Sequence, residues 1–333
     1  SIPSIPHNEN ARPIIEYTVQ QAGEVVAEFL RKGGKKNLIM TGAGVSVDSG
    51  IAPYRGKNGH YTIHKTYRPI FFHEFTDLSE KGHLYRQRYW SRSYLGFPPV
   101  RYALPNRTHY SVAALQWLGH IPRYITQNVD NLHHAATPSP SLAAQTILEL
   151  HGTLSNVVCV STPDGKGRPN SSDAPPPPYN RVMYERMSQS HLIGPRSAHP
   201  RAENTPTGEA YPRGCGFRGS RGAFQDVLTE WNPKWDRLAR DMEATGMQPK
   251  TNPDGDVQLG GDVDYSSFNY PACPQCGGVL KPAVIFFGES VPDRLRDHSY
   301  ELVDNAESML LIGSSLATYS AFRLVKQAVE AKK

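Results

Sequence analysis

Residues 37–46 read Asn-Leu-Ile-Met-Thr-Gly-Ala-Gly-Val-Ser, a short apolar run that passes directly into a glycine turn. The run has the length of a buried strand, and the backbone amides of the turn, with the positive end of a following helix, could hold a pyrophosphate. The turn departs from the dehydrogenase fingerprint, because Val47 replaces the third glycine and no acid lies about 20 residues further on. This disfavours hydride transfer. An ordinary strand-to-helix turn remains an alternative for this segment.

The rest of the chain alternates between strand-sized and helix-sized apolar segments. Strands are expected at residues 123–126, 147–150, 284–287 and 308–312, and helices at 14–30, 110–118, 294–305 and 321–331. This alternation predicts an α/β fold, a Rossmann-like parallel sheet with helices on both faces. Ligands bind such sheets beyond the carboxyl ends of the strands. Polar and glycine residues follow the expected strands at 42–46, 127–130, 151, 288–289 and 313–315.

Composition narrows the class of protein. The chain has 333 residues, enough for roughly two domains, and its 38% hydrophobic and 20% charged residues fit a globular protein. No run approaches the roughly 18 apolar residues of a membrane span, and a net charge of +5 is small for a dedicated nucleic-acid binder. Four cysteines, two of them in Cys273-Pro-Gln-Cys276, favour a reducing compartment and a metal over disulfides.

Residues 161–214 differ from everything around them. They hold ten of the 28 prolines and few aliphatic residues. Such a stretch buries too little apolar surface to offset its ordering entropy. We predict a largely disordered insertion with at most a short helix near 182–187.

Two polar groups at strand ends are candidates for chemistry. The first is Gln127, Asn128 and Asp130 with Val129 between them, for which the alternative is a helix cap, because Asn and Asp both cap well. The second is His151, for which the alternative is a hydrogen-bonded histidine without a catalytic role. Because both follow strands of one sheet, they are expected to share a cleft, and this favours His151 as a general base.

The cysteines suggest a zinc site. Cys273-x-x-Cys276 followed by two glycines is typical of a zinc knuckle, whose turn directs two thiolates at one tetrahedral ion. Two more ligands are needed. Only Cys159 and Cys215 remain, 56 positions apart, and they could instead be unrelated buried thiols.

Taken together, these motifs resemble the sirtuins, the NAD-dependent protein lysine deacylases. The resemblance covers nearly the whole chain except the proline-rich insertion, and its motifs occur in the family order: 41–51 with 54–56, 126–130, 149–152, 286–289 and 313–315. Within the family the chain is most similar to class II, the mitochondrial sirtuin-4 branch, through residues 86–92, 105–109, 232–233, 254–257 and 273–287. Two departures are the missing aspartate in Ile51-Ala-Pro-Tyr-Arg55 and an end at Lys333, before the family's later strand and its asparagine-containing loop. We therefore expect a C-terminally truncated fragment.

The resemblance implies a domain division, cofactors and site residues. Residues 1–158 and 281–333 would form a discontinuous NAD-binding domain and 159–280 a zinc-binding module. His151 would be the general base, with Asn128 orienting the ribose and Asp130 holding nicotinamide. The residues that would contact NAD are Gly42, Ala43, Gly44, Ser46, Ile51, Tyr54, Arg55, Gln127, Asn128, Val129, Asp130, Gly313, Ser314 and Ser315. Phe287, Gly288 and Glu289 would line a groove for the peptide, which adds as a strand.

The family's first zinc pair is a second Cys-x-x-Cys, and Thr162 stands here at its second cysteine. The residues after Cys215 resemble those that follow that cysteine in class II. We therefore predict that the insertion divides the knuckle, and that Cys159, Cys215, Cys273 and Cys276 bind one structural Zn²⁺. A loop can be lengthened at modest entropic cost if its ends stay close.

The expected activity is removal of acyl groups from protein lysines, with release of nicotinamide and O-acyl-ADP-ribose. The alternatives are mono-ADP-ribosyl transfer at the same site and a non-catalytic zinc-braced scaffold. Residues 81–107 carry six Lys or Arg and no acid. Tyr89 and Arg92, one helical turn apart, resemble a pair that binds acidic acyl groups in another mitochondrial sirtuin, which predicts a preference for carboxyl-terminated acyl groups. The alternative is a solvated basic helix face. We expect acylated protein lysines as partners, no nucleic acid or membrane, a monomer, and location in the mitochondrial matrix.

Overall fold

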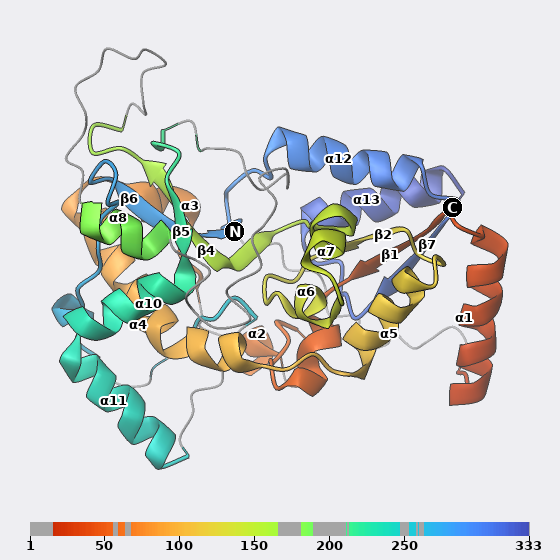
Figure 1. Cartoon of the computed structure of the whole chain (residues 1–333), viewed down its shortest axis with the longest axis horizontal. Helices are drawn as coiled ribbons and strands as arrows, with labels where there is room; N and C mark the ends of the chain where they lie inside the picture. Colours follow the sequence, from red (N-terminus) through yellow and green to blue (C-terminus); the bar gives the residue numbers. More distant parts are fainter. Residues whose placement is uncertain are drawn as a thin grey trace.

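The computed structural model describes residues 16–55, 59–63, 68–165, 181–188, 211, 213–246, 253–257, 259 and 263–332. Figure 1 shows a lobe built on a parallel sheet beside a second lobe that contains a smaller sheet and the long helix α4 (Glu80–Tyr102). The predicted α/β architecture is confirmed.

The larger sheet is parallel and carries the expected strand ends. Its strands are β1 (Asn37–Thr41), β2 (Arg123–Thr126), β3 (Ile147–Glu149) and β7 (Ser308–Ile312), in the order β3-β2-β1-β7. Thr41 is in register with Thr126 and with Ile312, and Thr126 with Glu149. All four strands therefore end at one edge, and the polar residues after them lie together.

Helices cover both faces of this sheet, because side chains alternate along β1. Leu38 and Met40 pack in one apolar cluster with α12 (Asp293–Asp304) and α13 (Tyr319–Glu330). Ile39 points the other way and packs with α1 (Val19–Gly33), α5 (Arg107–Trp117) and α7 (Pro140–Thr146). In Figure 1 α12 and α13 lie above the sheet, and α1 and α5 lie on its other side.

The smaller sheet corrects one expected strand. It is antiparallel, with β4 (Gly152–Ser161) between β5 (Arg218–Ser220) and β6 (Val279–Val284). The strand expected at 284–287 in the parallel sheet is wrong: it lies at 279–284 and pairs with β4. Gly152 (φ 81°) makes this possible, because a Cβ there would lie 2.0 Å from the Ala283 carbonyl oxygen.

The helices of the second lobe surround an aromatic core. Trp90 of α4 is fully buried against Phe75 of α3 (Phe72–Thr76) and Phe224 of α10 (Arg221–Trp231). The remaining elements are α2 (His60–Ile63), α6 (Leu132–Ala136), α8 (Arg181–Ser188), α11 (Pro233–Ala244), and the 3₁₀ helices η1 (Ala43–Ser49) and η4 (Tyr265–Ser267). The short helix expected in the insertion is α8. The insertion was also predicted to be largely disordered, and most of its residues lie outside the described ones.

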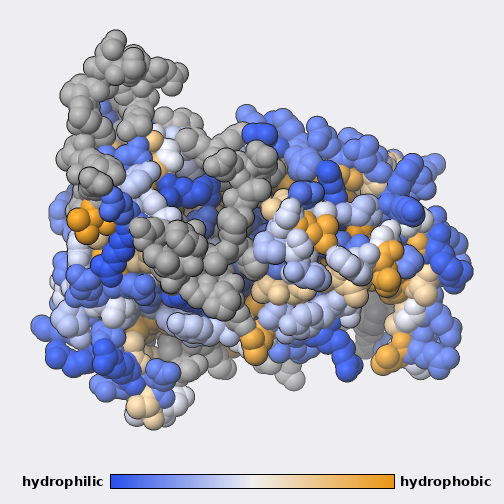
Figure 2. Space-filling view, viewed as in Figure 1, coloured by the Kyte–Doolittle hydropathy of each residue, from blue (hydrophilic) through white to orange (hydrophobic). Residues whose placement is uncertain are grey.

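Helix α4 is buried along most of its length. Arg86 and Arg92 are 7% and 4% exposed, so the solvated-face alternative is wrong for these two cations. In Figure 2 the apolar residues on the visible surface are interspersed with hydrophilic ones. Among the described helices, none is long and apolar enough to cross a membrane.

Candidate active site

The glycine turn is shaped by a contact between two loops. A Cβ on Gly42 would lie 2.8 Å from the Gly313 carbonyl oxygen, and one on Gly44 would lie 2.8 Å from the Gly313 Cα. The Gly42 and Gly44 amides donate to the carbonyls of Ile312 (3.0 Å) and Gly313 (2.8 Å). Loop contact alone thus requires glycine here, and these two amides are engaged within the protein. The pyrophosphate site stays a prediction, carried by Ala43, Ser46 and the 3₁₀ helix η1.

Ser46 is the centre of a buried polar cluster. Its hydroxyl donates to the Asp130 Oδ2 at 2.6 Å and accepts from the Asn128 Nδ2 at 3.1 Å. The Asp130 Oδ1 accepts from the Leu132 amide at 3.0 Å, at the start of α6. The helix-cap interpretation therefore accounts for one of the two carboxyl oxygens of Asp130. Burial raises the pKa of Asp130 above its usual value. The structure thus brings the predicted Ser46, Asn128 and Asp130 into one hydrogen-bonded group.

Two further histidines lie beside this cluster and were missed as site residues. The His109 Nε2 is 3.5 Å from the Ser46 hydroxyl, and the rings of His109 and His133 are 4.7 Å apart. The His133 Nε2 lies 2.9 Å from the hydroxyl of Thr41 at the end of β1. Burial lowers the pKa of His109 to about 4 and that of His133 to about 3, so both are neutral at pH 7. The signal that could have found them is their position, since His109 ends the motif at 105–109 and His133 follows the polar motif at 126–130 by three residues.

His151 follows β3, and its surroundings determine its tautomer. Its Nδ1 lies 3.1 Å from the Gln127 carbonyl oxygen, which can only accept, so Nδ1 carries the proton. The lone pair is then on Nε2, which accepts from the Ser320 hydroxyl at 2.7 Å. Burial lowers the pKa of His151 to about 4. A neutral imidazole with its lone pair on Nε2 is the form a general base requires.

The loops after β2 and β7 meet through side chains. The Gln127 Nε2 donates to the Ser314 hydroxyl at 2.7 Å, and Ser315 is exposed beside it. Val129 is buried, and its carbonyl accepts from the Leu154 amide at 2.9 Å, which ties this edge of the sheet to β4.

The structure describes residues 51–55 of the predicted NAD-binding loop. Ile51 is buried, and its amide donates to the Ser46 carbonyl at 3.3 Å. Tyr54 stacks on Tyr61 with ring centroids 5.8 Å apart, and the Arg55 guanidinium lies 5.8 Å from the Tyr61 ring. Gly56, the last residue of this motif, lies outside the described residues.

Glu289 holds a turn together from the inside. Its carboxylate is 5% exposed and accepts from the Phe286 amide (2.7 Å), the Lys281 ammonium (3.1 Å) and the Tyr211 hydroxyl (2.5 Å). The Phe287 carbonyl accepts from the Phe72 amide at 2.9 Å, and Gly288 is exposed with φ 76°. The groove-lining role of these residues stays a prediction, and the structure adds that the side chain of Glu289 faces inward.

Tyr89 and Arg92 lie on the buried side of α4. The Tyr89 ring is 5.2 Å from those of Phe75 and Phe286. The Arg92 guanidinium faces a carboxylate of this chain, because its NH2 donates to the Asp256 Oδ2 at 2.5 Å. The structure therefore places Tyr89 against Phe286 and pairs Arg92 with an internal anion.

The four cysteines form one buried cluster. Their Sγ atoms all lie within 4.8 Å of one another, with 3.6 Å between Cys159 and Cys276 and 3.6 Å between Cys215 and Cys273. A tetrahedral ion with zinc–sulfur bonds of about 2.3 Å places sulfurs about 3.8 Å apart, so the cluster fits Zn²⁺. The Thr162 amide donates to the Arg213 carbonyl at 2.7 Å, so the ends of the insertion meet. The predicted division of the knuckle is in agreement with this contact.

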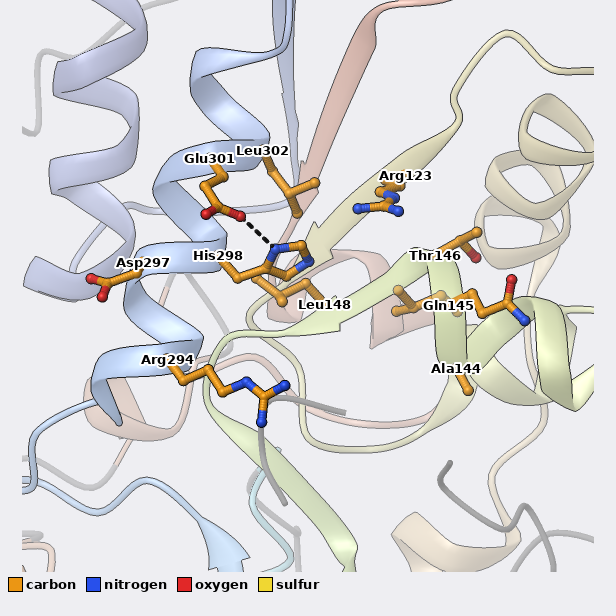
Figure 3. Close-up of a pocket in the computed structure, with 11 residues that line it drawn as sticks. Arg123, Ala144, Gln145, Thr146, Leu148, Arg294, Asp297, His298, Glu301 and Leu302 are labelled. Atoms are coloured by element: carbon orange, nitrogen blue, oxygen red, sulfur yellow. Dashed lines mark hydrogen bonds and ion pairs between the residues drawn. The ribbon is translucent and has the colours of Figure 1, made fainter. Parts of the chain in front are cut away.

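The more voluminous of the two cavities described here does not lie at the predicted active site. A cavity of about 730 Å³ lies between α12 and the amino ends of β2 and β3, where Figure 3 shows Arg123, Arg294 and His298 around it. It contains none of the predicted site residues. A cavity of about 40 Å³ lies between Asp130 and the apolar residues Phe97 and Leu154.

The chain matches the Sir2 family over residues 42–175 and 229–320 and therefore belongs to that family. A protein of Batrachochytrium dendrobatidis named NAD-dependent protein deacylase SIR4 is 37% identical over 321 residues, which are 95% of this chain and 84% of that protein. NAD-dependent protein deacylase SRT2 of Arabidopsis thaliana is 34% identical over 301 residues, 88% of this chain and 62% of that protein. A solved structure described as "The Structural basis for Sirtuin Substrate affinity" superposes with a TM-score of 0.52 at 19% identity, covering 92% of this chain and 82% of that one. At that identity the likeness shows the fold.

Proposed function

We propose that this protein removes acyl groups from protein lysines with NAD as co-substrate, releasing nicotinamide and O-acyl-ADP-ribose. The observation that carries the proposal is the state of His151: the Gln127 carbonyl fixes its proton on Nδ1, and burial keeps its Nε2 unprotonated at the strand ends. The names of the relatives, NAD-dependent protein deacylases, support the same activity.

The residues at the strand ends fit NAD by their chemistry. Ala43 and Ser46 would hold the pyrophosphate, Ser314 and Ser315 the far end, and Asn128 and Asp130 the nicotinamide ribose and amide. When bound, NAD supplies a ribose carbon that the acyl oxygen can attack as nicotinamide departs. His151 then takes a proton from a ribose hydroxyl through Nε2, in the place where the Ser320 hydroxyl now donates. Asn128 and Asp130 keep fixed positions through Ser46.

The test is incubation of the protein with NAD and a panel of acyl-lysine peptides, with products identified by mass. Nicotinamide and acyl-ADP-ribose are expected, and ADP-ribosylated protein in their place would indicate the alternative transferase. His151→Ala should lower turnover about 100-fold or more, the scale of general base catalysis. His298→Ala is the matched control, because His298 pairs with the exposed Glu301 on α12 and lies outside the site. Near-normal turnover by His151→Ala would contradict the assignment.

We further propose that acyl groups ending in a carboxylate, of glutaryl or methylglutaryl type, are preferred over acetyl. The resemblance of Tyr89 and Arg92 to a pair that binds acidic acyl groups supports this proposal, and the ring of Tyr89 contacts Phe286. In the structure the buried Arg92 is paired with Asp256.

We also propose that the protein acts as a monomer on acylated protein lysines, without nucleic acid or a membrane, in the mitochondrial matrix. Resemblance to the class II branch supports the location. The two separate sheets support two structural units. The boundaries at 158 and 281 stay a prediction, because β4 (Gly152–Ser161) and β6 (Val279–Val284) of the smaller sheet cross them. Light scattering of the purified protein and imaging of a tagged form in cells test state and location.

A further inference from the structure

Arg92 is held by a segment far away in the sequence. Its NH2 donates to the Asp256 Oδ2 at 2.5 Å and its Nε to the Val257 carbonyl at 2.6 Å. Asp256 is itself fixed, because its Oδ1 accepts from the Val257 amide at 2.9 Å. Both side chains are about 95% buried, at 5% and 6% exposure. An anion thus already occupies the guanidinium predicted to bind a substrate carboxylate.

A short series of contacts connects the helix that carries Arg92 to His151. The Ile285 amide donates to the His151 carbonyl at 2.9 Å, and the next residue, Phe286, contacts the Tyr89 ring. Tyr89 lies one helical turn from Arg92 on α4. The side chain of Phe286 also packs on the apolar cluster of Ile51 and other residues beside Asp130. Arg92 therefore shares α4 with Tyr89, and the ring of Tyr89 contacts the segment that is hydrogen-bonded to the His151 backbone.

A second acid lies beside the pair. The Asp254 Oδ1 is buried and has no hydrogen-bond partner among the described residues. Burial and the neighbouring Asp256 raise the pKa of Asp254 to about 7. Residues 254–257 pack closely on α4, because a Cβ on Gly96 of that helix would lie 2.4 Å from the Gly255 carbonyl oxygen. Two carboxyl groups and one guanidinium therefore share this buried place.

We propose that Asp256 determines the acyl-group specificity, by holding Arg92 in an internal ion pair that a carboxylate at the end of the acyl chain must displace. The inference rests on the proposed deacylase function and deepens it. A substrate carboxylate competes with Asp256 for one guanidinium, whereas an acyl group without charge leaves the pair intact. The native protein therefore has a weaker preference for carboxyl-terminated acyl groups than Arg92 alone would give.

The experiment compares two acyl groups of equal length, glutaryl-lysine and pentanoyl-lysine, in one peptide. Asp256→Asn keeps the shape of the side chain and removes its charge. The ratio of kcat/KM for glutaryl over pentanoyl should rise about tenfold, the value of one charge-assisted hydrogen bond. Asp293→Asn, which breaks an exposed ion pair on α12, is the matched control and should leave the ratio unchanged. An unchanged ratio in Asp256→Asn, or an equal rise for both peptides, overturns the inference.

A second measurement does not depend on turnover. In the His151→Ala background, Asp256→Asn should tighten binding of the glutaryl peptide about tenfold and leave the pentanoyl peptide unchanged. If Asp256→Asn fails to fold, Asp256→Ser removes the same charge with a smaller side chain. The ratio should again rise about tenfold, and no rise overturns the inference. Failure of the deacylase proposal is distinguishable, because the unmodified protein would then release no nicotinamide with either peptide.

Discussion

Replacing Cys215 by serine tests the long-range zinc site. The sulfur pairs at 3.6 Å are close to the roughly 3.8 Å of a tetrahedral zinc–thiolate site, so little rearrangement is needed to bind the ion. All four cysteines are buried, and the variant leaves three thiolates around the ion. Structural zinc contributes on the order of 10 kcal/mol to folding in zinc fingers, comparable to the whole stability of a domain. Cys215→Ser should therefore lose the metal and unfold the zinc module.

Elemental analysis should find one zinc per chain in the unmodified protein and far less in Cys215→Ser and Cys273→Ser, with similar falls in melting temperature. Thr162→Ala is the control, because Thr162 stands where a compact knuckle would have its second cysteine. Deleting residues 163–212 should leave the metal bound, since the Thr162 amide and Arg213 carbonyl already meet. Full zinc in Cys215→Ser would refute the reasoning.

Two further predictions follow from buried groups. Because burial lowers the pKa of His151 to about 4, the base stays neutral until the pH falls through that value, so the acid limb of kcat/KM should lie near pH 4. A midpoint near the ordinary histidine pKa of about 6.5, in enzyme that recovers full activity at pH 7, would contradict this. Tyr211→Phe removes one of the donors to the buried Glu289 carboxylate and should raise KM for the peptide about tenfold with little change in kcat. Tyr319→Phe, at an exposed tyrosine, is its control, and equal KM values in the two variants would show that Tyr211 does not position the substrate loop.

The local pattern of apolar and polar residues was sufficient to predict the strands around the cofactor site. Strands β2, β3 and β7 lie within a residue of their expected bounds, because each is a short apolar run that ends in glycine or polar residues. The strand expected at 284–287 was wrong, because an apolar run has the same appearance in a parallel and an antiparallel sheet, and Gly152 redirects the chain between them.

The sequence by itself determined the parallel sheet, the polar residues at its carboxyl edge and the identity of the four cysteines, because strand periodicity and ligand chemistry are local properties. Only the tertiary structure decided which groups meet. It showed that the ends of the insertion come together, that Gln127 selects the tautomer of His151, and that Asp256 lies on Arg92. Arg92 and Asp256 are 164 positions apart, and no periodic pattern specifies such a contact. It depends on how α4 packs against the zinc module, and that packing is a property of the whole fold.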